Sequence, residues 1–198
     1  MSEGKINSIG KNILTSSPYT IYQAGLLAWL VTGDIKYGVF TFLAVIMGDG
    51  ANYFEKKIAR YVMEKLGYKK EGARPNGCGT SSGENCTGCG IYSSSKTSHT
   101  WGMPSGHAQI TSFAATYWTI YVWIKYREET DKEKKQALFT SAIVSSIVMW
   151  LLAFAVWSQR VYSKCHSIFQ IIVGMVIGIG FGILGYWVSS YLKNIPNI

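Results

Sequence analysis

Three short polar blocks in this sequence hold the residue types that phosphate chemistry requires. They are "ARPNG" around Arg74, "PSGH" ending at His107, and "QRVYSKCH", which contains Arg160 and ends at His166. Arginine binds phosphate oxygens through a planar pair of N–H donors, and histidine can act as a nucleophile or as a general acid. The blocks therefore predict a phosphoryl-transfer site, provided that the fold brings them together.

The middle block directly precedes an apolar run, so Ser105, Gly106 and His107 are expected at the N-terminus of a helix. Free backbone N–H groups and the positive end of the helix dipole bind anions there. Gly106 would allow a ligand to approach the backbone closely, and Ser105 would add a hydroxyl donor. Taken singly, the blocks have ordinary interpretations: Arg74 as a solvated loop charge, His107 as a helix cap, and Arg160 as a headgroup contact.

The elements that must position these blocks are five apolar runs, at residues 18–33, 37–53, 108–126, 138–157 and 167–192. About 20 apolar residues cross a bilayer as a helix, with about 17 as the lower limit, so the last three are long enough. The first two are short and joined by "DIK", which predicts a helical hairpin or, alternatively, two re-entrant or interfacial helices. The expected fold is all-α: a single-domain polytopic membrane bundle over residues 1–198, with about five transmembrane helices.

The region after the second run is predicted to contain a helical extension and then a long loop. Apolar residues recur there at every fourth position, which indicates that the second helix continues past the membrane surface; they are Phe54, Ile58, Val62 and Leu66. A stretch rich in Gly, Ser and Cys follows and is expected to be a long active-site loop. Five crossings would place residues 54–107 and 158–166 on the same side, so all three polar blocks would share one face.

The net charge, the first apolar run and the spacing of glycines each add an expectation. The net charge of +8 is attributed to lysines at membrane ends and to phosphate-binding cations, not to nucleic acid, because no basic stripe is interleaved with aromatic residues. The first run is expected to act as an uncleaved insertion signal. Gly174, Gly178 and Gly182 form a GxxxGxxxG pattern, which predicts close helix packing within the chain or, alternatively, a dimer face. The oligomeric state and the orientation in the membrane stay open.

The cysteines allow several interpretations. Cys78, Cys86 and Cys89 lie in the predicted loop. Together with His99 they resemble the ligand set of a zinc knuckle. They would form a loop disulfide in an oxidising compartment and would remain free thiols in the cytosol. No metal is expected at the phosphate site, because the aspartates of the chain are scattered and form no carboxylate cluster there.

In order and type, the blocks "RP", "PSGH" and "R-x5-H" resemble those of the type 2 phosphatidic acid phosphatase (PAP2) superfamily, which also includes soluble vanadium haloperoxidases. The resemblance spans Arg74 to His166. It implies a helical bundle that hydrolyses lipid phosphates through a phosphohistidine, with no metal and no cofactor. Carried over to this sequence, His166 is the nucleophile, and His107 protonates the leaving oxygen and then activates water. The residues that would hold the phosphoryl oxygens are Arg74, Ser105, Gly106 and Arg160.

The first departure from the family pattern concerns a lysine. The family places it seven residues before the arginine of the first block, where this chain has Gly67. Lys56 is the expected substitute, because Asn52 and Lys56 are four residues apart on the helical extension and resemble the Asn-containing helix of the family. Lys69 and Lys70 are the alternatives.

The second departure is Gln170, where most of the family has aspartate. Residues 166 and 170 share a helix face, so the amide oxygen of Gln170 is expected to orient the ring of His166, although without a full charge. On this view an aspartate at position 170 would retain or raise turnover. A glutamine here resembles the dolichyl-diphosphatase branch, whose third block reads "SRVY…H…Q", although this chain has Gln159 in place of the serine.

This resemblance favours a polyprenyl (dolichyl-type) diphosphate as substrate, cleaved to the monophosphate and phosphate. Two alternatives stay open: another lipid phosphate such as phosphatidate, and a non-enzymatic scaffold that binds lipid phosphate. The expected location is an internal membrane such as the endoplasmic reticulum, crossed several times.

Overall fold

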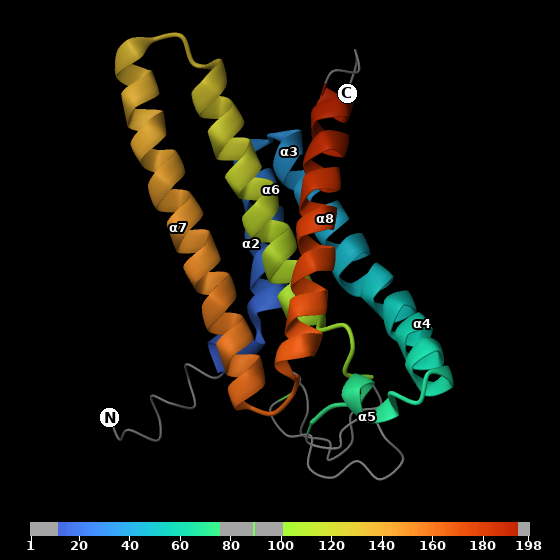
Figure 1. Ribbon diagram of the computed structural model, residues 1–198. Helices are drawn as coiled ribbons and strands as arrows, with labels where there is room; N and C mark the ends of the chain where they lie inside the picture. Colours follow the sequence, from blue (N-terminus) through green and yellow to red (C-terminus); the bar gives the residue numbers. More distant parts are fainter. Residues whose placement is uncertain (1–11, 76–88, 90–100, 194–198) are drawn as a thin grey trace.

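The computed structural model describes residues 12–75, 89 and 101–193, and within them every regular element is a helix (Figure 1). The elements are α2 (Ser17–Thr32), α3 (Ile35–Val45), the π-helical segment η1 (Ile46–Gly50), α4 (Ala51–Lys65), α5 (Lys69–Gly72), α6 (Gly106–Glu128), α7 (Lys132–Tyr162) and α8 (Ile168–Lys193). The central helix is α6, which contacts α2, α3, η1, α7 and α8. The predicted all-α fold is confirmed for this part of the chain.

The predicted hairpin between the first two runs is confirmed as α2 and α3. Gly33 ends α2 in the left-handed conformation, with φ of 66°, which favours glycine. Asp34 then caps α3, its side chain accepting from the backbone N–H of Lys36. The two helices pack closely, since a Cβ added to Gly25 would meet the ring of Phe40 at 3.0 Å.

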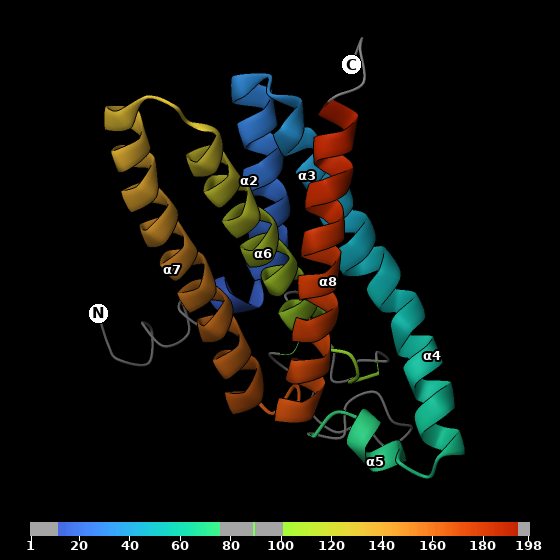
Figure 2. The ribbon, with the colours of Figure 1, turned by 45° about the horizontal axis from the view of Figure 1, so that its top comes forward.

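The predicted extension of the second helix is also confirmed, because α3, η1 and α4 follow one another without a break. In Figure 2, α4 leans away from α8 toward the end that carries α5. The apolar stripe of α4 points outward: Phe54 is 64% exposed and Leu66 63%. Neither η1 nor the short helix α5 was predicted, and α5 spans the point where the predicted extension ends and the predicted loop begins.

The glycine pattern of α8 faces α6. A Cβ at Gly174 would collide with the backbone of Ser105, and one at Gly178 with the carbonyl oxygen of Gln109. The prediction of close packing within the chain is therefore confirmed. This contact places the start of α8 directly against the start of α6, where two of the polar blocks lie.

Within the residues that the structure describes, two helices are long and apolar enough to cross a bilayer, Lys132–Tyr162 and Ile168–Leu192. Large apolar side chains cover the outer face of α7: Ile147 is 54% exposed, Leu151 61% and Phe154 62%. Such a surface fits lipid better than water. The arrangement with five crossings stays a prediction.

The polar blocks lie at one end of the bundle, as predicted. Figure 1 shows α5 and the α7–α8 turn at one end, and the α2–α3 turn, the α6–α7 turn and the end of α8 at the other. Helix α6 begins at the first end, so its N-terminus faces the α7–α8 turn.

Candidate active site

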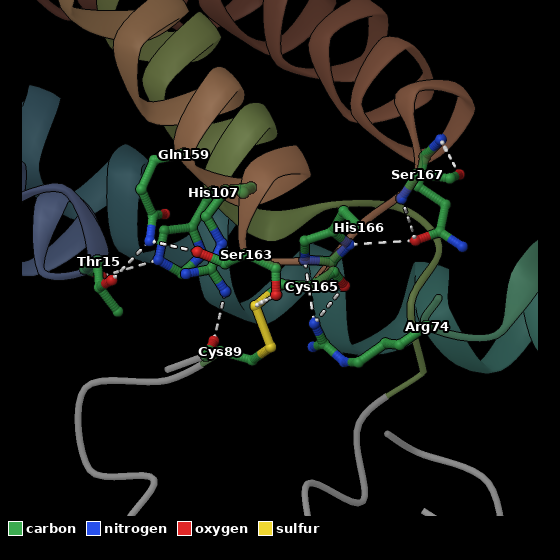
Figure 3. Close-up of a disulfide and its surroundings, with 11 residues drawn as sticks. Thr15, Arg74, Cys89, His107, Gln159, Ser163, Cys165, His166 and Ser167 are labelled. Atoms are coloured by element: carbon green, nitrogen blue, oxygen red, sulfur yellow. Dashed lines mark hydrogen bonds between the residues drawn. A yellow bond between two sulfur atoms is a disulfide. The ribbon is translucent and has the colours of Figure 1, made fainter. Parts of the chain in front are cut away.

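Arg74 from the first block and His166 from the third are in direct contact. Nη1 of Arg74 lies 3.2 Å from Nε2 of His166 and donates to the carbonyl oxygen of Cys165 at 3.0 Å (Figure 3). Arg74 is only 7% exposed and His166 only 2%. The interpretation of Arg74 as a solvated loop charge is therefore wrong.

Gln170 lies on the other side of the His166 ring. Its Oε1 is 3.3 Å from Nδ1 of His166, as the four-residue spacing predicted. Its Nε2 donates to the carbonyl oxygens of Glu71 at 2.8 Å and Ala73 at 2.7 Å, two contacts that the sequence did not reveal. At the start of α8, Ser167 fixes Gln170 further, since its hydroxyl oxygen accepts from the Gln170 backbone N–H.

The middle block begins α6, as predicted. The hydroxyl oxygen of Ser105 accepts from the N–H of Ala108, and the N–H of Ser105 donates to the carbonyl oxygen of Gln170. Close to Gly106 lies the amide of Asn52, whose Oδ1 would be 2.9 Å from an added Cβ. The missing Cβ of Gly106 thus leaves room for the amide of Asn52, and the predicted contact of this glycine with a ligand stays a prediction.

His107 points toward Thr15, two residues before α2. Its Nε2 lies 2.8 Å from the carbonyl oxygen of Thr15. Because a carbonyl oxygen only accepts, Nε2 must carry the proton, and Nδ1 keeps the lone pair. This contact fixes the tautomer of His107, and no pattern in the sequence indicates it.

Of the three candidate lysines, the structure brings Lys56 to this end of α6. Its Nζ donates to the carbonyl oxygens of Trp101 at 2.6 Å and Pro104 at 2.9 Å, directly before Ser105. Lys69 and Lys70 are exposed.

Asn52, one turn before Lys56, is held by a residue that the sequence analysis missed. Its Nδ2 donates to Oε1 of the fully buried Gln109 at 2.8 Å. Gln109 in turn donates to the carbonyl oxygen of Met47 in η1. This pair of amides joins the start of α4 to the first turns of α6.

Arg160 is fully buried and donates through Nη2 to the carbonyl oxygen of Cys89. A disulfide joins Cys89 to Cys165, the residue directly before His166. The zinc knuckle, the disulfide within the loop and the free thiols are therefore wrong for Cys89, because its sulfur is bonded to a cysteine outside the loop. Cys78, Cys86 and His99 lie outside the described residues.

Burial and mutual repulsion shape the electrostatics of the site. Burial, and then the charges of Arg74 and Lys56, hold the pKa of His166 well below its usual range. Burial, followed by the charge of Arg74, likewise lowers the pKa of Lys56, and burial lowers that of Arg74 to about 10. His166 is thus neutral at physiological pH, and an anion in the site would relieve the repulsion between the cations.

Metal ligands are not grouped in the described part of the chain: no cluster of three or more His, Cys, Asp or Glu side chains there is placed to hold an ion. The groups that the structure gathers around His166 are instead hydrogen-bond donors and cations. Such a set suits an oxyanion and a nucleophilic histidine.

The family model described as PAP2 superfamily matches residues 79–194, more than half of the chain. The chain belongs to the PAP2 superfamily. The match contains the second and third blocks, whereas Lys56 and Arg74 precede it. A dolichyldiphosphatase of Saccharomyces cerevisiae (strain ATCC 204508 / S288c) is 30% identical over 95 residues, which cover 48% of this PAP2 chain and 36% of that protein. No solved structure matches the chain significantly.

Proposed function

We propose that this PAP2 protein is a metal-independent lipid phosphatase that forms a phosphohistidine at His166. The observation that carries the proposal is the buried His166 ring, with Gln170 at Nδ1 and Arg74 at Nε2. A neutral ring in this setting has its lone pair on Nε2, next to a phosphate-binding guanidinium. The predicted roles of the other site residues follow from this placement.

The first half of the reaction transfers a phosphoryl group to the enzyme. Nε2 of His166 attacks the terminal phosphorus, and the bond from phosphorus to the leaving oxygen breaks. The lipid leaves with one phosphate group fewer. His107 first takes up a proton from water at Nδ1, which the negative charge of the bound phosphate favours. It then donates this proton to the leaving oxygen, while Nε2–H stays on the carbonyl oxygen of Thr15. The groups that would hold the phosphoryl oxygens are Lys56, Arg74, Arg160, Ser105 and the backbone at Gly106.

The second half regenerates the enzyme. Nδ1 of His107, now unprotonated, accepts a proton from water as the water oxygen attacks phosphorus. The bond from Nε2 of His166 to phosphorus breaks, and inorganic phosphate leaves. Gln170 orients the ring of His166 through both halves, because its Oε1 accepts the proton of Nδ1.

The proposed substrate is a polyprenyl diphosphate of the dolichyl type. The support is the partial similarity to a dolichyldiphosphatase and Gln170, which resembles that branch more than it resembles phosphatidate phosphatases. The apolar outer surface of the bundle suits a long isoprenoid chain. The proposal includes the predicted multi-pass arrangement of about five spans, one domain over residues 1–198 and a location in an internal membrane.

Phosphate release by the detergent-purified protein tests this function, with dolichyl diphosphate and phosphatidate compared in the presence of a chelator. We expect dolichyl diphosphate to be cleaved at the higher kcat/KM, and His166→Ala to be inactive. Rapid quenching with substrate labelled in the terminal phosphate should leave an acid-labile, alkali-stable label on the protein. Loss of activity in chelator, or full activity of His166→Ala, would refute the mechanism. Lipid binding without turnover would support the scaffold alternative.

A further inference from the structure

The geometry points to Gln170 as a positioning residue with two effects: its carboxamide fixes the proton of His166 on Nδ1, and it holds the segment that carries Arg74. As a statement about catalysis this inference rests on the proposed function, but the hydrogen bonds behind it are independent of any reaction. It also explains why this chain has an amide at a position where most of the family has a carboxylate.

The contacts of Gln170 allow only one orientation of its amide. The atom that faces Glu71 and Ala73 lies within 2.8 Å of one carbonyl oxygen and 2.7 Å of another. Because carbonyl oxygens only accept, this atom must be the NH2 group, and the oxygen must face His166. An oxygen at Nδ1 requires the ring proton there. The lone pair is therefore on Nε2, the atom that Arg74 contacts.

A carboxylate at position 170 would satisfy His166 but not the segment on the other side. It would bring a charged oxygen against two carbonyl oxygens at a fully buried position, where water cannot relieve the repulsion. In the unmodified protein, the hydrogen bonds from Nε2 of Gln170 hold the carbonyl groups of Glu71 and Ala73. Ala73 directly precedes Arg74. Without these bonds the guanidinium would lose its fixed place beside His166. This reverses the sequence-based expectation that an aspartate would serve here.

The test is Gln170→Glu, which keeps the shape of the side chain and replaces NH2 by oxygen. At about pH 7.5 we expect kcat for dolichyl diphosphate to fall about 100-fold, which corresponds to about 2.7 kcal/mol. As the pH falls toward about 5.5, the loss should shrink at least about fivefold relative to the unmodified protein, because a protonated carboxyl can donate to Ala73. If Gln170 only oriented the ring, Gln170→Glu would be at least as active as the unmodified protein at neutral pH, and that result would overturn the inference.

Gln159→Glu is the matched control. It adds the same charge directly before Arg160, but Gln159 donates to two hydroxyls, those of Thr15 at 3.4 Å and Ser163 at 2.9 Å. Hydroxyls can rotate and donate to a carboxylate, so activity should stay within about threefold. An equal loss in Gln159→Glu would assign the effect to charge alone and would also overturn the inference.

A measurement without turnover separates this inference from the proposed function. The chain has three histidines, so ¹⁵N-histidine NMR of the detergent-solubilised protein can resolve the ring tautomers, with His166→Gln identifying the signals of His166. We expect Nδ1–H at His166, and its loss in Gln170→Ala. If the protein cleaved no lipid phosphate but showed this tautomer, only the function would fail. Nε2–H at His166 in the unmodified protein would overturn the inference whatever the activity.

Discussion

The disulfide between Cys89 and Cys165 connects the two arginines of the site through the backbone. Arg160 donates to the carbonyl oxygen of Cys89, and Arg74 donates to that of Cys165. The bonded cysteines are 76 residues apart in sequence, and both are buried. Each proposed phosphate-binding guanidinium is thus held in part by one half of the same disulfide.

Loss of this disulfide should therefore impair activity directly. In Cys89→Ser/Cys165→Ser we expect kcat/KM to fall at least about tenfold, because Arg160 loses the fixed carbonyl that positions it; one charge-assisted hydrogen bond contributes about 1.5–3 kcal/mol. Phosphate release at several substrate concentrations measures the change. Cys86→Ser is the control, since it replaces a cysteine three residues before Cys89 that is not part of this pair. Unchanged activity of the double variant would refute the positioning role.

The lowered pKa of His166 predicts the acid side of the pH profile. The ring must be neutral to attack, so on the acid side activity falls when the pH drops below the pKa of His166. Because that pKa lies well below its usual value, kcat/KM should remain high below about pH 6.5, the ordinary pKa of histidine. The profile of kcat/KM between about pH 4 and 8 measures this limb.

Removing a neighbouring positive charge should raise the pKa of His166 and move the acid limb of the pH profile to higher pH. Arg74→Gln keeps an N–H donor but removes a cation that lowers the pKa of His166, so the limb should move to higher pH. Arg60→Gln is the control, because Arg60 is exposed and bonded to Glu64. A limb that stays in place in Arg74→Gln would contradict the electrostatic origin of the shift.

Lys56 should matter and Lys70 should not. Lys56 reaches two carbonyl oxygens just before Ser105, whereas Lys70 is exposed. We expect Lys56→Met to lower kcat/KM about 10- to 100-fold, the cost of one charge-assisted hydrogen bond, and Lys70→Met to stay within about threefold. Steady-state kinetics of both variants measure these effects. A larger loss in Lys70→Met than in Lys56→Met would show that Lys56 is not the phosphate-binding lysine.

Much of the fold could be predicted because it depends on local patterns. The apolar runs predicted α6, α7 and α8, and the polar "DIK" turn predicted the hairpin. The π-helical segment η1 could not be predicted, because it depends on contacts between distant residues. A Cβ at Gly48 would meet Ile110 and Tyr22 at 2.8 Å each, and no local pattern encodes that requirement.

The same distinction between local patterns and distant contacts applies to the site. The order of the blocks predicted that His107, Arg160 and His166 would meet at one end of the bundle, because the number of helices between them fixes the side on which each lies. The disulfide of Cys89 could not be predicted, since no spacing rule links it to Cys165. The second effect of Gln170 was hidden for another reason: its partners are backbone carbonyls, which every residue has.

The packing of α8 on α6 gives a prediction about stability with a control in the same helix. A Cβ at Gly178 would overlap the carbonyl oxygen of Gln109, whereas one at Gly180 would meet nothing within 4 Å. Gly178→Ala should therefore lower the stability by about 1–3 kcal/mol, the usual cost of overpacking, and Gly180→Ala should leave it unchanged. Thermal unfolding in detergent measures both. Activity should fall in Gly178→Ala as well, because forcing the helices apart moves Ser105 away from Gln170, to whose carbonyl oxygen it donates. Equal stability of the two variants would show that α8 does not pack on α6 through this glycine face.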